Sequence, residues 1–378
     1  MSNFDNAMRR QVMSLPNLIK EQYEDLEPKT RKVLTTPEIF SIQRIILTGC
    51  GDSYAAALAT KHTFEMLTNI PTEVVTAIEL SRLYSKLQLG FAPLNPLVIA
   101  VSNSGGVARV GEAIQRVNKC GGFTLGITGN TESLLGKNAS KVLELDIPAF
   151  ESAPGTRSYM VSVMSLLLMA IRIGEVRGSY TMDQAMSYRY DIANQADALE
   201  KMLPNMDEQV LQIAHEWKRM EAYDFIGAGF DYAAAWFGHA KIYEAIGKYA
   251  MHINTEEWLH LNFFIKNIDD IGTILIANTT NPTFSRAKEL AKYMEMLGRP
   301  SIIITDGTKE DFDIDTNYIQ VPKTEYPITM PLTQYVPICL LAGYIGEMLG
   351  EKDGRGCEGR WKFCEGGASV RNSEIIIK

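Results

Sequence analysis

The stretch TGCGDSYA at residues 48–55 constrains the fold more than any other part of this chain. It follows the apolar run RIIL at 44–47, which is typical of a buried strand, and leads into the alanine-rich run 55–66, which favours a helix. A strand, a tight glycine turn and a helix N-terminus form a cradle for an anion, because the first N–H groups of the helix lack partners and the helix dipole is positive there. Ser53 adds a hydroxyl donor. We therefore expect an α/β fold with an anion site at this turn.

The same arrangement recurs further along the chain. The apolar run LVIAV at 97–101 is followed by the turn SNSGG at 102–106 and by a helical stretch through Arg116. Turns at the carboxyl ends of two parallel strands form the kind of crevice in which open α/β sheets bind ligands. The pattern predicts a site for a small, anionic, hydroxyl-rich molecule; the alternative is a pair of ordinary strand-to-helix turns.

The composition excludes several classes of protein. A length of 378 residues predicts two or three domains, and a net charge of −8 argues against a nucleic-acid surface. The five cysteines include no CxxC pair and no His/Cys ligand spacing, so we expect reduced thiols and no metal. The apolar run 159–173 is short and contains serines, which predicts a core helix. No signal peptide precedes it, and we expect a cytoplasmic protein without a membrane partner.

The order of elements predicts five segments. Alternating strands and helices indicate parallel, doubly wound sheets. The expected segments are an N-terminal helical segment at 1–32 interrupted near Pro16, a first α/β domain at 33–180, linker helices at 181–220, a second α/β domain at 221–350 and a C-terminal tail at 351–378.

The second α/β domain repeats the first in order and spacing. The corresponding pairs are GAGFDYA at 227–233 with residues 49–55, NTTN at 278–281 with residues 102–105, and the strand and turn at 301–307 with residues 124–130. We therefore predict two copies of one αβα fold. The second copy has Asn278 and Thr280 in place of Ser102 and Ser104, so ligand binding is expected in the first copy.

Acid–base chemistry needs a carboxylate together with a histidine or lysine. The second copy offers Glu244, on a helix expected over 233–249, and His260. Glu244 is equally well placed to pair with Lys241 on the same helix face, and His260 lies among apolar residues that are typical of a packing histidine. Glu256 and Glu257 are further candidates. The residues alone leave these alternatives open.

The ordered set of motifs resembles the sugar isomerase (SIS) superfamily over most of the chain, and within it the isomerase half of glucosamine-6-phosphate synthase and the sugar-phosphate deglycases. The matching stretches are RQVMSLP at 10–16, GDSY at 51–54, SNSG at 102–105, GTRS at 155–158, GHAKIYE at 238–244 and EWLH at 257–260. The resemblance implies two tandem SIS domains, each a Rossmann-like αβα sandwich with a parallel five-stranded sheet between helices.

The resemblance also implies roles for particular residues. Glu244 would be the base that moves a proton between C1 and C2 of an open-chain sugar phosphate, and His260 would help to open the ring. The histidine can come from a neighbouring subunit in this family, which implies a homodimer with a shared active site. No metal or organic cofactor is implied. The implied substrate-binding residues are Gly51, Ser53, Ser102, Asn103, Ser104, Thr156 and Ser158.

Several positions depart from the family pattern. Gly106 and Val107 stand where the family usually has a carboxylate and a threonine that holds phosphate, so the anionic group stays open and Arg109 is a candidate replacement donor. Leu261 and Asn262 replace a Gly-Pro pair. From Arg371 onward the tail has a lysine only at Lys378, so the family's tail lysine is not assigned here. The sequence opens on the isomerase-type helix with Ser2 after Met1, and no glutaminase domain is expected.

Three functions remain open at this point. The first is an aldose–ketose isomerase or a deglycase acting on a sugar phosphate or its amino adduct. The second is a non-catalytic regulatory protein that binds a sugar phosphate. The third, a nicotinamide-linked dehydrogenase, is weakly supported because GCGDSY at 49–54 lacks the third glycine of the dinucleotide motif.

Overall fold

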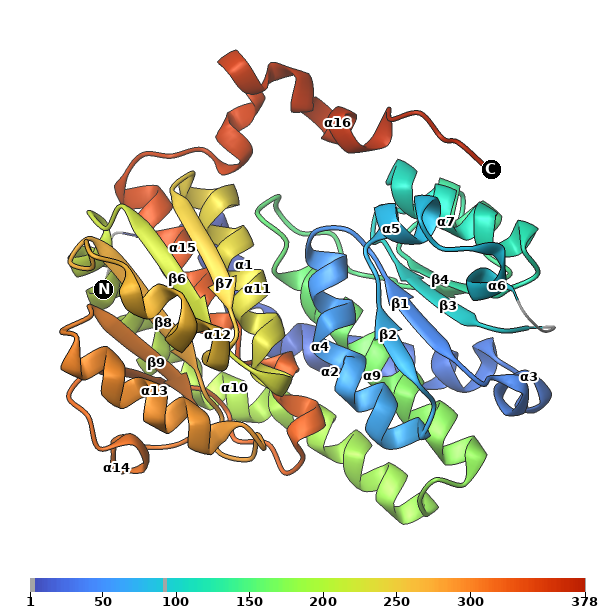
Figure 1. The fold of residues 1–378 in the computed structure, drawn as a ribbon, viewed down its shortest axis with the longest axis horizontal. Helices are drawn as coiled ribbons and strands as arrows, with labels where there is room; N and C mark the ends of the chain where they lie inside the picture. Colours follow the sequence, from blue (N-terminus) through green and yellow to red (C-terminus); the bar gives the residue numbers. More distant parts are fainter. Residues whose placement is uncertain (1–3, 91–93, 378) are drawn as a thin grey trace. The chain divides into compact units, whose positions relative to one another are not determined.

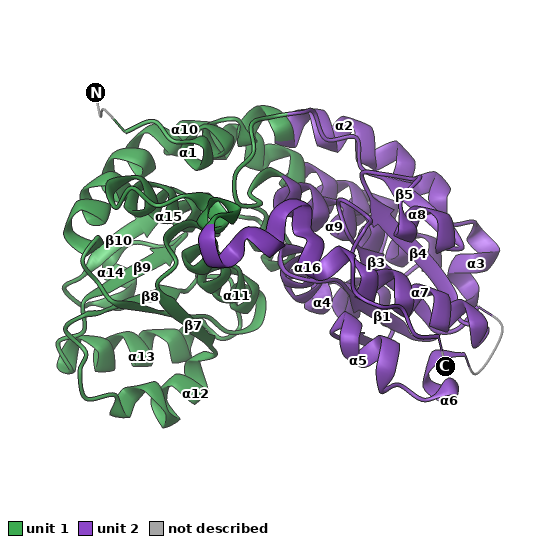
Figure 2. Ribbon diagram, turned by 90° about the horizontal axis from the view of Figure 1, so that it is seen from above, with its two compact units in different colours: residues 1–18, 150–157, 191–358 green, residues 19–149, 158–190, 359–378 purple. Residues whose placement is uncertain are grey.

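The computed structural model describes residues 4–90 and 94–377, which form two compact units (Figures 1 and 2). Both units are discontinuous in sequence. Unit 1 comprises residues 1–18, 150–157 and 191–358, and unit 2 comprises residues 19–149, 158–190 and 359–378. The contiguous domain boundaries expected from the sequence stay a prediction. Ser2 and Lys378 lie outside the described residues.

Unit 2 is built on a five-stranded parallel sheet. Its strands are β1 (Ile45–Thr48), β2 (Thr72–Val74), β3 (Leu97–Val101), β4 (Phe123–Thr128) and β5 (Lys141–Glu144), in the order β2-β1-β3-β4-β5. Every residue of β1, β3 and β4 is buried, as expected for a sheet covered on both faces. The strands β1 and β3 are neighbours, and Thr48 at the end of β1 pairs with Ala100 near the end of β3. Their carboxyl ends therefore lie side by side.

Helices lie on both faces of this sheet (Figure 1). Those within unit 2 are α3 (Thr36–Ser41), α4 (Asp52–Thr68), α5 (Ala77–Arg82), α6 (Lys86–Leu89), α7 (Ala108–Lys119), α8 (Leu134–Asn138), α9 (Arg157–Arg177), the 3₁₀ segment η6 (Gly359–Gly367) and α16 (Ala368–Arg371). The longer helices α2 (Leu15–Val33) and α10 (Met182–Trp217) each contain a boundary between the units. One apolar cluster joins the sheet to α7, with Val98 packed beside Val110 and Ile114.

Unit 1 repeats the topology of unit 2. Its strands are β6 (Ala222–Ile226), β7 (Tyr249–Ile253), β8 (Ile271–Ile276), β9 (Ser301–Thr305) and β10 (Asn317–Gln320), all parallel and in the order β10-β9-β8-β6-β7. When the strands of each sheet are numbered from its first strand, both orders read 2-1-3-4-5. The prediction of two copies of one αβα fold is therefore confirmed.

The remaining elements of unit 1 surround its sheet and include one π-helix. They are α1 (Ala7–Met13), η1 (Gly229–Asp231), α11 (Tyr232–Lys241), the π-helix η2 (Ile242–Ile246), α12 (Thr255–His260), η3 (Asn262–Phe264), α13 (Phe284–Met296), α14 (Lys309–Phe312), η4 (Pro327–Leu332), α15 (Val336–Met348) and η5 (Asp353–Cys357).

The helix expected over 233–249 is shorter than predicted. The α-helix gives way to the π-helix at Ile242, and the chain leaves it through Gly247, whose φ of +74° suits glycine. Strand β7 then begins at Tyr249. The prediction missed this strand because the apolar residues on either side of Gly247 read as one continuous helical pattern.

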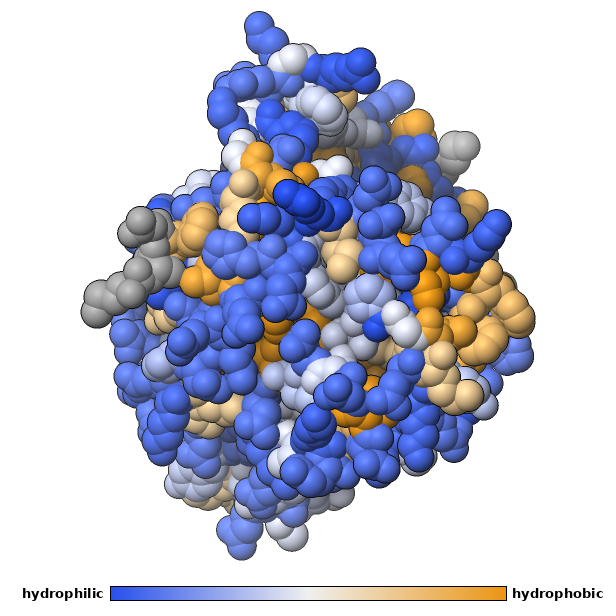
Figure 3. Space-filling view, turned by 90° about the vertical axis from the view of Figure 1, so that its left-hand side faces the viewer, coloured by the Kyte–Doolittle hydropathy of each residue, from blue (hydrophilic) through white to orange (hydrophobic). Residues whose placement is uncertain are grey.

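Two segments are long and apolar enough to span a membrane, namely α9 and residues Pro327–Met348. Of their most apolar windows, 83% and 100% of residues are buried inside the protein, so burial in the core accounts for their composition. The predicted core helix at 159–173 is confirmed as part of α9. The face drawn in Figure 3 is mostly hydrophilic, with apolar residues in separate patches.

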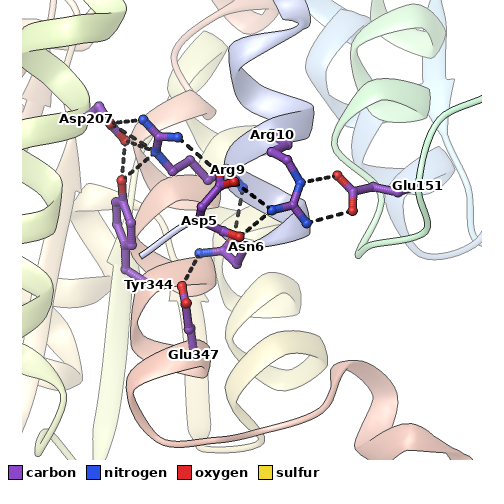
Figure 4. A network of polar contacts seen from close by, with 8 residues as sticks. All are labelled: Asp5, Asn6, Arg9, Arg10, Glu151, Asp207, Tyr344 and Glu347. Carbon is purple, nitrogen blue, oxygen red and sulfur yellow. Dashed lines mark hydrogen bonds and ion pairs between the residues drawn. The ribbon is translucent and has the colours of Figure 1, made fainter. Parts of the chain in front are cut away.

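A network of charged side chains fixes the N-terminal helix α1 within unit 1 (Figure 4). The guanidinium of Arg9 donates to both carboxylate oxygens of Asp207, with Nε 3.1 Å from each, and to the hydroxyl of Tyr344 on α15 at 3.0 Å. Arg10 forms a second fork with Glu151, in which Nη2 lies 2.8 Å from Oε2. Bidentate pairs of this kind fix geometry as well as adding energy. Helix α1 therefore anchors the segment 150–157.

Candidate active site

The first predicted turn joins β1 to α4 in unit 2. Gly51 is the residue before the helix and has a φ of +57°, which favours glycine. Gly49 has no room for a side chain, because an added Cβ would lie 2.7 Å from the backbone carbon of Ser53. Ser53 is half-buried in the first turn of α4. The two glycines thus let the backbone fold tightly enough to hold Ser53 at the start of the helix.

The second predicted turn joins β3 to α7. Ser102 is buried, whereas Asn103 and Ser104 are exposed. The carbonyl of Asn103 accepts a hydrogen bond from the Gly129 N–H at 2.9 Å, which ties the turn to the end of β4. Gly105 has a φ of +63°, and an added Cβ would lie 1.8 Å from Oγ of Ser133. The exposed side chains of this turn therefore stand on a rigid backbone.

The sheet order brings these two turns together. Since β1 and β3 are neighbours in a 2-1-3-4-5 sheet, their carboxyl ends form the switch point at which such sheets bind ligands. Helix α7 begins there without a side-chain cap at Val107, so no capping side chain covers the N–H groups of its first turn. The predicted residues that share this edge of unit 2 are Gly51, Ser53, Ser102, Asn103 and Ser104. We call residues 49–53 and 102–106 the serine turns.

The predicted residues Thr156 and Ser158 lie at the start of α9. Ser158 belongs to unit 2, is partly exposed, and its carbonyl accepts from the Ser162 hydroxyl at 2.7 Å. Thr156 belongs to unit 1 and is buried; its hydroxyl donates to the Pro154 carbonyl at 3.2 Å. Because the Thr156 hydroxyl has this internal acceptor, its backbone N–H is the better candidate for contact with a ligand.

Glu244 lies on the π-helix η2 of unit 1. Its carboxylate accepts from the ammonium of Lys241, which is fully buried and lies 4.7 Å from the centre of the Phe237 ring. The pairing with Lys241 considered from the sequence is therefore present. The Glu244 side chain is 41% exposed, so the ion pair orients the carboxylate without covering it. Single π-helical turns inside α-helices are rare and frequent at functional sites, which favours a functional role for this segment.

His260 lies at the end of α12 and points to solvent. Its side chain is 67% exposed, and Nε2 lies 3.4 Å from Oε1 of Glu256. Glu256 also binds Arg286 with both carboxylate oxygens, at 2.7 Å and 3.2 Å. The packing role considered for His260 is therefore wrong, since the ring is mostly exposed. Within unit 1, Glu244 pairs with Lys241 and His260 with Glu256, so the two predicted catalytic residues have different partners.

The equivalent crevice of unit 1 is filled by its own side chains. Asp231 stands at the position that corresponds to Ser53, and it is buried. Its carboxylate accepts from the backbone N–H of Asn278 at 3.1 Å, from the Asn278 side chain at 2.6 Å and from the Asn281 side chain at 2.7 Å. Burial raises the pKa of Asp231 to about 7, against the opposing effect of these hydrogen bonds. This self-contained cluster agrees with the expectation that ligand binding belongs to the first copy.

The sequence suggested Arg109 as a donor to the anionic group in place of the family's threonine, but its guanidinium already has partners in the protein. It pairs with Glu112 at 2.6 Å and donates to Ser373 at 3.2 Å, so two of its nitrogens are already engaged. Sequence reasoning missed Glu112 and the tail segment that it holds. The one available signal was the i,i+3 spacing of Arg109 and Glu112 on one helix face.

Other features of the described residues do not offer an alternative site. A cavity of about 360 Å³ in unit 1 is lined by Ala245, Glu347, Glu351 and Asp353, among others, and its carboxylates would repel an anion. Among the residues that the structure describes, no group of three or more His, Cys, Asp or Glu side chains is placed to hold a metal ion.

Part of the chain is similar to a described protein family, and the whole fold is similar to known structures. Residues 38–172 match the family model described as "SIS domain". The described fold is similar to the C-terminal domain of glucosamine-fructose-6-phosphate aminotransferase from Francisella tularensis, with a TM-score of 0.82 and 16% identity over 93% of this chain and 98% of that one. Residues 38–172 are therefore similar to an SIS domain, and the two α/β units have the tandem fold of that C-terminal domain.

The chain is also similar to a second aminotransferase in sequence and to a sugar-phosphate isomerase in fold. Over 355 residues the chain is 24% identical to glutamine–fructose-6-phosphate aminotransferase [isomerizing] of Gloeobacter violaceus, covering 92% of this chain and 56% of that protein. The chain thus spans about half the length of the curated relatives it matches. Tagatose-6-phosphate ketose/aldose isomerase from Escherichia coli has a similar fold, with a TM-score of 0.73 and 15% identity over 93% of this chain and 96% of that one.

We expect Gly105→Ala to destabilise the protein more than Gly121→Ala. Both glycines have positive φ, which costs an alanine about 1–2 kcal/mol, but only the Cβ at Gly105 would collide with Ser133, whereas nothing lies within 4 Å of a Cβ at Gly121. Urea unfolding of the two variants measures the difference. Equal losses of stability would show that the second serine turn is not held rigidly.

We expect the buried carboxyl of Asp231 to make the protein less stable as the pH rises. Its folded pKa of about 7 lies above the unfolded value, so its contribution to stability is fully present below about pH 4 and is lost as the pH rises through 7. The loss is at most about 4 kcal/mol. The thermal midpoint measured from pH 5 to pH 8 should fall less steeply in Asp231→Asn than in the wild type. The exposed control Asp315→Asn should keep the wild-type slope; an unchanged slope in Asp231→Asn contradicts the prediction.

Proposed function

We propose that this protein is a cytoplasmic enzyme that moves a proton between C1 and C2 of a sugar phosphate, either as an aldose–ketose isomerase or as a deglycase. The observation that carries the proposal is the asymmetry between the two switch points. The one in unit 2 presents the exposed Ser104 and half-buried Ser53, while the one in unit 1 is filled by Asp231. The similar aminotransferase is named for fructose 6-phosphate and the similar isomerase for tagatose 6-phosphate, which supports a sugar phosphate as the ligand.

In the proposed mechanism, the serine turns bind the anionic end of the sugar. Hydroxyls and backbone N–H groups supply the hydrogen bonds, and the N-terminus of α7 supplies a favourable dipole. The substrate-binding residues are Gly51, Ser53, Ser102, Asn103, Ser104, Ser158 and the backbone near Thr156.

Glu244 is the proposed base. Its carboxylate removes the proton from the carbon next to the carbonyl, and the electron pair of that C–H bond forms an enediolate whose charge lies on the former carbonyl oxygen. The proton then returns to the neighbouring carbon while the hydroxyl proton passes from one oxygen to the other, which exchanges aldose and ketose. The ion pair with buried Lys241 holds the carboxylate in one orientation during this transfer. The reaction needs no metal or organic cofactor.

A deglycase would begin with the same step. Removal of the C1 proton from a 1-amino-1-deoxyketose and its return to C2 give an imine at C1. Water then adds to the imine, and the amine leaves as the aldose forms. Glu244 therefore has the same first role in both reactions.

His260 is proposed to open the sugar ring in a homodimer. The imidazole is 67% exposed at the end of α12, and the neighbouring Leu261 and Phe264 are 61% and 74% exposed. A histidine beside exposed apolar side chains is suited to a surface that a second copy covers. In that arrangement His260 serves the serine turns of the partner.

The alternative function is a regulatory protein that binds a sugar phosphate without converting it. The exposed carboxylate of Glu244 on a π-helical turn favours the enzyme. The two functions differ in whether product forms.

We expect Glu244→Gln to abolish turnover while leaving binding intact. A positioned base contributes about 10²- to 10⁴-fold, so the rate of product formation followed by NMR should fall by that factor. A thermal-shift screen of sugar phosphates and aminated sugar phosphates first identifies the ligand, since a ligand at 100 times its Kd adds about 2.7 kcal/mol of stability.

Glu208→Gln is the matched control for this experiment, because Glu208 is an exposed carboxylate of the same unit. It should keep wild-type turnover. Tight binding without product in the wild type would support the regulatory protein, and unchanged turnover in Glu244→Gln would remove Glu244 as the base.

A further inference from the structure

The C-terminal tail of the chain packs on helix α7 of unit 2. The tail consists of η6, α16 and the extended residues that follow (Figure 1). Arg109 on α7 donates to the hydroxyl of Ser373 at 3.2 Å and to the carbonyl of Glu374. The N–H of Ile376 donates to Oε2 of Glu112 at 2.6 Å. Side chains of α7 thus bind Ser373, Glu374 and Ile376 of the tail.

Glu112 is the anchor of this arrangement. Its side chain is fully buried between the guanidinium groups of Arg82 and Arg109. Burial acts to raise the pKa of Glu112, but the hydrogen bonds from Arg82 and from the Ile376 amide outweigh it, so the pKa lies below its usual value. A buried carboxylate needs such partners, and one of them is the tail backbone. The tail is therefore held in a defined position.

This position places Arg371 over the second serine turn. A Cβ added to Gly106 would lie 3.7 Å from both Cδ and Nε of Arg371. Gly106 is also the residue whose N–H lies 3.5 Å from the Ser104 hydroxyl. Among the residues that the structure describes, none accepts a hydrogen bond or forms an ion pair with the guanidinium of Arg371, and its side chain is exposed. A cation without a protein partner thus lies beside the turn that presents Ser104.

We propose that Arg371 is a ligand-binding residue of the serine turns and that it selects a phosphate monoester as the anionic group of the sugar. This proposal rests on the function proposed above. A guanidinium presents a planar fork of donors that fits two phosphate oxygens at once, while the Ser104 hydroxyl and the N–H groups at the start of α7 are free to take the third. A neutral hydroxyl end of a sugar would leave the guanidinium unused.

Because the net charge of the chain is negative, binding of an anion depends on a positive charge at the site. The protein carries −8 overall, so a dianion gains nothing from its long-range field and depends on charges at the site. Arg109 is occupied by Glu112 and the tail. Arg371 is the arginine at this turn that is left for the ligand.

The test compares Arg371→Ala, Arg371→Lys and Arg360→Ala in the full-length protein. Arg360 is an exposed arginine of the same tail, so its loss changes the net charge equally. Calorimetry with fructose 6-phosphate, glucose 6-phosphate, glucosamine 6-phosphate and tagatose 6-phosphate gives the Kd of each protein. We expect Arg371→Ala to weaken binding of the preferred sugar phosphate by about 10-fold or more, since a charged hydrogen bond is lost. Arg371→Lys should recover part of this affinity, and Arg360→Ala should bind as the wild type does.

The outcomes separate this inference from the proposed function. If the wild type binds none of the four sugar phosphates, the proposed function fails, and the assignment of Arg371 fails with it. If the wild type binds one of them and Arg371→Ala binds it equally well, only the role of Arg371 is overturned. Equal weakening by Arg360→Ala would assign the effect to net charge instead. Binding of glucuronate as tight as that of the sugar phosphate would overturn the selection of phosphate.

Discussion

The adjacency of the first and third strands is the constraint on which each unit of this protein depends. A parallel strand that follows the second must cross over, and when it pairs with the first strand the two carboxyl ends meet at one edge. The turns after β1 and β3 then face a common space. Glycine is needed at 49 and 105 because an added Cβ would collide with a neighbouring residue, and it is favoured at 51 because φ is positive there. A binding site follows from topology before any particular side chain is chosen.

The two copies of the fold have used that common space in opposite ways. In unit 2 the side chains at the switch point are small hydroxyls, and nothing caps the start of α7. In unit 1 the carboxylate of Asp231 occupies the equivalent position and accepts hydrogen bonds from the side chains of Asn278 and Asn281. A buried carboxylate also repels an anionic ligand. The switch point of unit 2 therefore exposes hydroxyl groups, whereas that of unit 1 is filled by its own side chains. Unit 1 also contains the π-helix that bears Glu244.

Local patterns predicted the parts of the fold that local physics determines. The buried strands β1, β3 and β4 were evident as apolar runs between turns, and the order of turns revealed the repeat. The pairing of Glu244 with Lys241 followed from helical spacing. Strand β7 was missed because a single glycine separates it from the preceding helix, and the π-helix has no periodic signature. The exposure of His260 was also missed, since its apolar neighbours Leu259, Leu261 and Phe263 suggested burial.

Contacts between distant parts of the chain were beyond reach of sequence patterns. The tail residue Arg371 and Gly106 meet because Glu112 and Arg109 bind the backbone and side chains near the C-terminus. No periodicity connects such residues. The same was true of Asp207, in the middle of the chain, whose carboxylate accepts hydrogen bonds from Arg9 near the start. Residue types identified the serine turns. They did not show that Arg371 and the tail lie beside the second of these turns.

The grouping of residues 359–378 with residues 19–149 has a consequence for how the protein is made. A ribosome releases the body of unit 2 early, and its sheet can form while the rest of the chain is still being synthesised. The segment that covers α7 is synthesised only after the whole of unit 1. Until then Glu112 lacks the amide of Ile376 and Gly106 lacks its neighbouring arginine. The edge of unit 2 that carries the serine turns is therefore completed only after residues 191–358 of unit 1 have been made.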